Sequence, residues 1–202
     1  MAMKILGLTG DIACGKSTVA QLLAGRGAAT LDSDLLVRDL YADSAFAARV
    51  QQLFGGDVRD SNGVIDRAKL GALVFGDAAK LRQLELLVHP AVAQLRAQKL
   101  RELANRGEKV VVIEAVKLLE SGQAQGCDEI WCVVCSPAVQ LERLVQKRGL
   151  SEAQARLRLE SQPSRATKSS LAQDTPLIWI ENDASLEQLS AQVARQWTRF
   201  LA

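Results

Sequence analysis

A glycine-rich stretch near the start of the chain has the residue types and spacing of a phosphate-binding loop. Gly10, Gly15, Lys16 and Ser17 fit the pattern G-x-x-x-x-G-K-[ST]. Glycine lets the backbone curl so that its N–H groups converge on phosphate oxygens, and a helix N-terminus favours an anion. We therefore expect Lys16 to reach the β- and γ-phosphates of MgATP and the Ser17 hydroxyl to bind Mg²⁺. The other residues expected at this nucleotide site are Asp11, Ile12, Ala13, Cys14 and Thr18.

Three residues inside this loop bear on how it works. Asp11 places a carboxylate near the phosphates, so we expect it to point away from them or to pair with a cation. Ala13 costs some backbone freedom. Cys14 stands at a helix N-terminus beside Lys16, conditions that lower the pKa of a thiol. We therefore expect thiol reagents to inactivate the protein and ATP to protect it.

Acidic side chains follow two of the expected strands. Asp32 and Asp34 come at the end of an apolar stretch at residues 28–31, and Glu114 ends a β-branched run at residues 109–113. Ligands of an open α/β sheet bind at the carboxyl ends of its strands. A hydroxyl that accepts a phosphoryl group needs a base or an orienting acceptor, which either aspartate could supply; each could instead cap the following helix. Glu114 is like a Walker B acid and could hold a water bound to Mg²⁺.

The stretch from Arg143 to Lys168 is strongly basic, with seven basic residues against two acids. Phosphoryl transfer needs cations around the transferring group and exclusion of water. Small nucleotide kinases supply both with a mobile helical lid, so we expect Arg143 and Arg148 to act on ATP from such a lid. The alternative is a solvated helical hairpin in which these arginines pair with Glu142 or Glu152 on the surface.

The composition is typical of a soluble α/β domain. The chain has 202 residues, 48% of them hydrophobic and 24% charged. No apolar run approaches the ~20 residues that span a bilayer, and no signal-peptide pattern is present, so we expect a cytoplasmic protein that binds no membrane. The net charge of +2 argues against a nucleic-acid binder. The absence of an N-K-x-D segment argues against a G protein.

Strand and helix patterns alternate along most of the chain, which predicts a doubly wound parallel sheet of about five strands, of the P-loop NTPase type. The stretch between Leu35 and Gly107 is almost all helix, with turns at residues 55–57 and 61–63, and is too long for one crossover. The predicted division is a nucleotide-binding core (1–34, 108–142 and 174–202), an inserted helical substrate domain (35–107) and a basic lid (143–173).

In their order and spacing, these motifs resemble those of bacterial dephospho-CoA kinases nearly from end to end. The elements that carry the resemblance are Leu8–Gly10, Gly15–Thr18, Leu31–Asp34, His89-Pro90, Glu114, Leu118–Glu120, Gln140–Leu144, Arg148–Ser151, Gln162 and Ile180–Asn182. Such kinases transfer the γ-phosphate of ATP to the 3′-hydroxyl of dephospho-CoA. The resemblance implies that Asp34 is the catalytic base and that Asp32 orients it or acts through Mg²⁺. It also places Asn182 near adenine and His89, beside Pro90 at a helix start, in the pocket for CoA, although a capping role for His89 is an alternative.

This chain departs from the family pattern in two places. The family loop normally reads Gly-Gly-Ile-Gly-Ser-Gly-Lys-Ser, so Asp11, Ala13 and Cys14 are unusual. The second place is the segment from Glu114, where the family more often has Asp, to Lys117, where the family has a proline. The Lys117 ammonium would either meet a phosphate of dephospho-CoA or pair with Glu114 or Glu120.

Two other functions remain open from the sequence. One is a different small kinase that acts on a nucleoside or nucleotide, and the other is an ATP-binding regulator that has lost catalysis. In each case we expect small-molecule ligands and a monomer or weak homo-oligomer.

Overall fold

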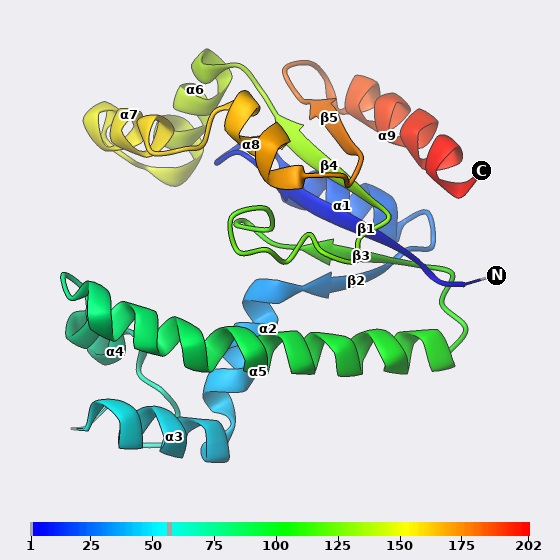
Figure 1. Cartoon of the computed structure of the whole chain (residues 1–202). Helices are drawn as coiled ribbons and strands as arrows, with labels where there is room; N and C mark the ends of the chain where they lie inside the picture. Colours follow the sequence, from blue (N-terminus) through cyan, green and yellow to red (C-terminus); the bar gives the residue numbers. More distant parts are fainter. Residues whose placement is uncertain (1, 56–57) are drawn as a thin grey trace. The chain divides into compact units, whose positions relative to one another are not determined.

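The structure is a computed structural model that describes residues 2–55 and 58–202 (Figure 1). The predicted turn at residues 55–57 therefore lies partly outside the described residues. The strands are β1 (Lys4–Gly10), β2 (Ala29–Asp32), β3 (Val110–Glu114), β4 (Glu129–Val134) and β5 (Leu177–Glu181). The helices are α1 (Lys16–Ala24), α2 (Ser33–Ala42), α3 (Ser44–Phe54), α4 (Arg67–Val74), α5 (Ala78–Asn105), α6 (Pro137–Arg148), α7 (Glu152–Glu160), α8 (Arg165–Ala172) and α9 (Leu186–Leu201).

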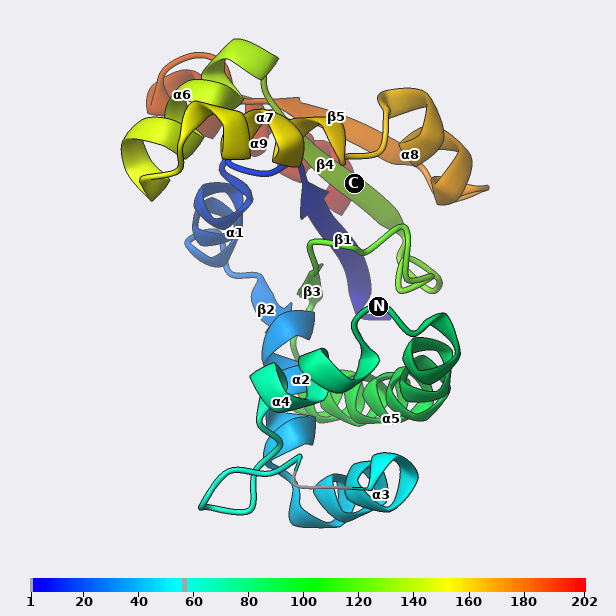
Figure 2. The same cartoon turned by 90° about the vertical axis from the view of Figure 1, so that its left-hand side faces the viewer.

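The strands of the described residues form one sheet in the order β2-β3-β1-β4-β5. β1 pairs in parallel with both β3 and β4, and β4 pairs in parallel with β5. Figures 1 and 2 place α1 and α8 on opposite sides of this sheet. β3 and β4 are buried along nearly their whole length, as their uninterrupted apolar runs require. The predicted fold class, a parallel α/β sheet of about five strands, is confirmed.

An apolar core lies between the sheet and helices α1 and α9. On α9, the buried residues Leu189, Val193, Trp197 and Phe200 recur every three or four positions, so they form one apolar face. Full burial of a large apolar side chain contributes about 1.5–3 kcal/mol. This packing makes the sheet a firm support for the loop that follows β1.

The chain divides into two compact units. The first unit contains the residues up to Leu31 and from Leu103 to Ala202, and the second contains residues Asp32–Glu102. The second unit has a core of its own, made of Phe46, Ala47, Val50, Val58, Ile65, Leu70, Val74, Leu84, Val88 and Val92. The predicted substrate domain, residues 35–107, overlaps most of this unit, and its role in binding a substrate stays a prediction.

The helix around Pro90 differs from the expectation. Pro90 does not mark a helix start but lies inside α5, a helix of 28 residues. Proline lacks an N–H group and so removes one helical hydrogen bond. Val88 and Val92, on either side of it, are both buried in the second core. Burial of this face keeps α5 continuous across Pro90.

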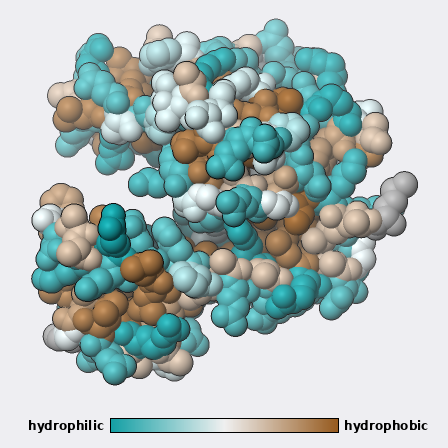
Figure 3. Space-filling model, in the orientation of Figure 1, coloured by the Kyte–Doolittle hydropathy of each residue, from teal (hydrophilic) through white to brown (hydrophobic). Residues whose placement is uncertain are grey.

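The face of the molecule in Figure 3 is covered mostly by hydrophilic side chains, with apolar patches between them. Within the part of the chain that the structure describes, no helix is both long and apolar enough to cross a membrane.

Candidate phosphate-binding site

The loop between β1 and α1 depends on its glycines. A Cβ atom on Gly10 would lie 2.7 Å from the carbonyl oxygen of Val133, and one on Gly15 would lie 2.4 Å from Nδ2 of Asn182. Gly15 also has a φ of +90°, which glycine adopts without strain. Ala13 has a φ of +61°, so this alanine carries the backbone cost expected of it, roughly 1–2 kcal/mol.

Hydrogen bonds from the neighbouring strands fix the path of the loop. The Asp11 amide donates to the carbonyl of Val133 at 2.9 Å, which ties the loop to β4. The side-chain amide of Asn182 donates to the carbonyl of Cys14 at 2.7 Å, which ties it to the end of β5. Asn182 is itself buried, so the sheet presets the loop geometry before any ligand arrives.

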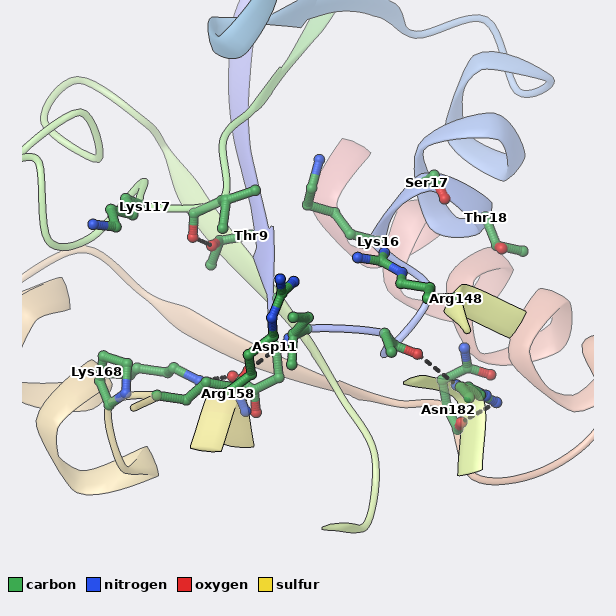
Figure 4. A pocket seen from close by; sticks show the side chains of 18 of the residues that line it. Thr9, Asp11, Lys16, Ser17, Thr18, Lys117, Arg148, Arg158, Lys168 and Asn182 are labelled. Carbon is green, nitrogen blue, oxygen red and sulfur yellow. Dashed lines mark hydrogen bonds and ion pairs between the residues drawn. The ribbon is translucent and has the colours of Figure 1, made fainter. Parts of the chain in front are cut away.

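A cavity of about 870 Å³ opens beside this loop, inside the first unit (Figure 4). Small-molecule sites typically have volumes of about 300–1,000 Å³. Most of the predicted nucleotide-site residues line this cavity, together with three of the predicted residues from elsewhere in the chain. The predicted residues that line it are Gly10, Asp11, Ile12, Ala13, Gly15, Lys16, Ser17, Thr18, Lys117, Arg143, Arg148 and Asn182.

Lys16 and Glu114 form an ion pair next to this cavity. The Lys16 ammonium lies 2.9 Å from Oε2 of Glu114, and the two side chains are only 19% and 13% exposed. Glu114 is the last residue of β3, which neighbours β1 in the sheet. The strand order therefore brings the acid of one strand to the lysine that follows the other. An ammonium held in this way is preset at the floor of the site.

Asp11 pairs with a cation, as the sequence predicted. Its partner is Lys168 on α8, a lysine whose side chain is only 7% exposed. Figure 4 shows the Lys168 side chain reaching across to Asp11 at the edge of the cavity. The carboxylate that the loop introduces is thus neutralised by a residue 157 positions later in the chain.

Arg143 takes part in building the site and does not form the surface pair with Glu142 considered above. Its guanidinium donates to the carbonyl oxygens of Ala13 at 3.3 Å and Asn182 at 3.0 Å. It therefore bridges the phosphate loop and the end of β5 while one side faces the cavity.

Arg148 is exposed at the end of α6 and lines the same cavity. Glu152, its predicted alternative partner, instead forms an ion pair with Arg156. Lys147 and Arg158 add further positive charge to the lining.

Two glutamines hold the loop in a way that the motif did not indicate. The side chain of Gln162, which follows α7, accepts a hydrogen bond from the Ile12 amide at 2.6 Å. The buried Gln140 of α6 donates to the Ile12 carbonyl at 3.0 Å. Both residues belong to elements that carry the family resemblance. The sequence therefore indicated these glutamines only through their position in the family pattern. That position does not identify Ile12 as their partner.

The expectation that the Cys14 thiol has a lowered pKa is wrong. Cys14 is fully buried, and its thiol lies 2.8 Å from the thiol of Cys135. That contact, together with burial away from water, raises the pKa of Cys14 well above the usual thiol value. Its side chain packs into the apolar core, although its backbone belongs to the loop. Proximity to Lys16 in sequence therefore gives no activated thiol.

The two aspartates and His89 belong to the second unit. Asp32 caps α2, because its carboxylate accepts hydrogen bonds from the amides of Asp34 at 2.8 Å and Leu35 at 3.3 Å. The capping alternative therefore holds for Asp32. Asp34 is exposed in the first turn of α2, and His89 is exposed in the middle of α5.

Lys117 lies exposed in the turn that follows β3 and lines the cavity. Its carbonyl accepts hydrogen bonds from the backbone and the hydroxyl of Ser121, so a compact turn forms without the proline of the family. Thr9 of β1 ties the same turn down by donating to the Val116 carbonyl at 3.1 Å.

Comparison with known proteins agrees along nearly the whole chain. The family model for dephospho-CoA kinase matches residues 4–188. A dephospho-CoA kinase of Geobacter sulfurreducens is 34% identical over 198 residues, covering 98% of both chains. One of Syntrophus aciditrophicus is 39% identical over 202 residues, covering 99% of this chain and 84% of the other.

The solved structures show the same fold. The crystal structure of TT1252 from Thermus thermophilus aligns with a TM-score of 0.78 at 29% identity and covers 98% of both chains. A dephospho-CoA kinase from Campylobacter jejuni aligns with a TM-score of 0.66 over 98% of this chain, at 19% identity. With the phosphate loop and its cavity in place, the match to the family model shows that this chain belongs to the dephospho-CoA kinase family.

Proposed function

We propose that this protein transfers the γ-phosphate of ATP to the 3′-hydroxyl of the ribose in dephospho-CoA, which gives coenzyme A. The observation that carries this proposal is the cavity, in which a phosphate loop and a set of basic side chains face one volume in a member of this family. Phosphoryl transfer is catalysed mainly by positioning and by charge stabilisation, and this lining supplies both.

Two chemically different groups of lining residues fit the two parts of ATP. Backbone amides of the loop, Lys16 and the first turn of α1 suit the phosphates. Ala184, Leu186 and Leu189, beside Asn182, offer an apolar wall for adenine. ATP would thus lie with its base toward β5 and its phosphates toward α1.

The hard oxygen donors beside the loop fit Mg²⁺, which usually takes one or two protein groups together with phosphates and water. The Ser17 hydroxyl lines the cavity, and the Glu114 carboxylate lies behind Lys16. When bound, Mg²⁺ would neutralise charge on the phosphates. Ser17 would hold it directly, and Glu114 would act through a water.

The basic residues would stabilise the transferring phosphoryl group. Arg148 is exposed to the cavity and free of Glu152, so its guanidinium is available for developing charge on the phosphate oxygens. Arg143 would hold the phosphate loop and the residue after β5, Asn182, in fixed positions relative to each other. We propose that residues 143–173 act as a lid that excludes water during transfer.

The acceptor side would come from the second unit and from Lys117. Asp34 lies two residues after the Asp32 cap, so its carboxylate stands on a fixed helix end and would accept the proton of the ribose hydroxyl. His89 and Lys117 would contact the CoA portion, Lys117 through a phosphate. We expect the protein to work in the cytoplasm as a monomer or weak homo-oligomer, with no nucleic acid or membrane as a partner.

A coupled assay of ADP release, with and without dephospho-CoA, tests the proposal. We expect MgATP turnover that depends on dephospho-CoA, and a product whose new phosphate is on the 3′ position by mass spectrometry and NMR. Turnover with nucleosides or nucleotides in its place would identify a different small kinase. ATP binding without transfer to any acceptor would identify a non-catalytic regulator, and either result would overturn the proposal.

A further inference from the structure

Lys168 is an unusual lysine because it is almost completely buried, with only 5% of the residue exposed. It lies in α8, whose first turn is capped by Ser164. Its ammonium contacts Oδ1 of Asp11, and both side chains face the cavity beside the phosphate loop. Burying an ammonium is costly unless a partner neutralises it, so the position of Lys168 depends on this carboxylate.

The Asp11 carboxylate also needs a partner of opposite charge. Its amide is bonded to Val133, which fixes the residue inside the loop, and its carboxylate is only 17% exposed. A carboxylate held there and left unpaired would repel the phosphates of a bound nucleotide. Two other cations next to the loop are engaged elsewhere, because Lys16 pairs with Glu114 and Arg143 donates to two carbonyl oxygens.

We propose that Lys168 is a positioning residue that neutralises Asp11 and turns its carboxylate away from the phosphates. The pair acts as one unit, which lets this phosphate loop carry an acid and still bind a nucleoside triphosphate. This inference rests on the part of the proposed function that places ATP in the cavity. It does not depend on the identity of the acceptor.

The pair also joins α8 to the loop. Gln162, which precedes α8 in sequence, accepts a hydrogen bond from the neighbouring residue Ile12. Consecutive loop residues are therefore held by one segment, residues 162–168, through one ion pair and one hydrogen bond. The Lys168–Asp11 pair thus neutralises the charge of the loop and also helps to position residues 162–168.

A double-mutant cycle tests the proposal through nucleotide binding alone. The variants are Lys168→Met, Asp11→Asn and the double variant, and calorimetry measures the dissociation constants for ATP, ADP and AMP. Lys168→Met leaves the Asp11 carboxylate unpaired, so we expect ATP affinity to fall about tenfold or more, ADP affinity less and AMP affinity least. We expect Asp11→Asn to bind ATP as well as or better than the parent, and the double variant to recover to within about threefold of the parent.

Two controls keep this test sharp. Lys168→Arg retains the charge and should retain ATP affinity. Lys80→Met removes an ion pair with Asp77 whose side chains are 49% and 42% exposed, and should leave ATP affinity unchanged. If Lys168→Met is too unstable to measure, the double variant and Asp11→Asn still decide the question.

Three outcomes would overturn the inference. A double variant as weak as Lys168→Met would mean that Lys168 binds phosphate directly. A loss that is equal for the three nucleotides would mean a purely structural role. Weak ATP binding by Asp11→Asn alone would make Asp11 itself a ligand. Because no acceptor is present, failure of dephospho-CoA as a substrate leaves the result unchanged, whereas a parent protein that binds no ATP would contradict both proposals.

Discussion

We propose Asp34 as the base in the chemical step of the reaction. Its carboxylate is exposed on the first turn of α2, whose start is fixed by the Asp32 cap. General-base catalysis contributes about 10²–10⁴-fold to a rate. We therefore expect Asp34→Asn to lower kcat by about two orders of magnitude or more while ATP affinity stays unchanged. Steady-state kinetics with dephospho-CoA and calorimetry with ATP measure the two quantities, and normal turnover by the variant would exclude Asp34 as the base.

The Cys14 thiol illustrates how the core overrides a local signal. Since its pKa is raised, the fraction present as thiolate at pH 7–8 is smaller than for an ordinary thiol, whose pKa is 9.0. We expect iodoacetamide to alkylate Cys14 only slowly in the folded protein and ATP to make little difference, while unfolding in urea exposes it. Peptide mapping by mass spectrometry follows each cysteine separately. Rapid, ATP-protected alkylation of Cys14 would show that this burial is not maintained in solution.

At the scale of elements, the bend between α6 and α7 relies on one glycine. Gly149 ends α6 with a φ of +65°, a conformation that costs other residues about 1–2 kcal/mol. Gly25 ends α1 with a φ of −63° and has room for a Cβ atom, so it is a matched control. We expect Gly149→Ala to lower the free energy of unfolding by about 1 kcal/mol and Gly25→Ala to be neutral or stabilising. Urea titrations of both variants check this, and equal effects would contradict the assigned backbone geometry.

The elements also show what a sequence can and cannot predict. The strands and most helices of the first unit follow from local patterns, such as the β-branched run of β3 and the capping box of Ser151 with Gln154. The partners of the site residues do not, because Gln162 with Ile12 and Lys168 with Asp11 are about 150 positions apart. Only the sheet order and the helix packing bring such residues together. Pro90 fails for the opposite reason, since packing in the second core overrides a local helix breaker.

At the scale of the whole molecule, the two compact units divide the proposed work. The cavity and the phosphate loop belong to the first unit, whereas Asp34 and His89 belong to the second. A ligand that binds only the folded state stabilises it by about 2.7 kcal/mol at a concentration of 100 times its dissociation constant. Thermal unfolding with and without MgATP therefore reports on the first unit independently of catalysis.

We therefore expect His89→Ala and Lys16→Met to differ in their effect on the thermal shift caused by MgATP. His89 is exposed on α5, so its removal should leave the thermal shift caused by MgATP unchanged and raise KM for dephospho-CoA several-fold. Lys16 is preset by Glu114 at the floor of the phosphate site, so Lys16→Met should abolish most of that shift and lower turnover by more than about 10²-fold. The Glu114 carboxylate loses its partner in this variant, and the double variant Lys16→Met with Glu114→Gln separates that effect from lost phosphate binding. If His89→Ala reduced the MgATP shift as much as Lys16→Met does, the nucleotide site would extend into the second unit and the assignment of one ligand to each unit would be wrong.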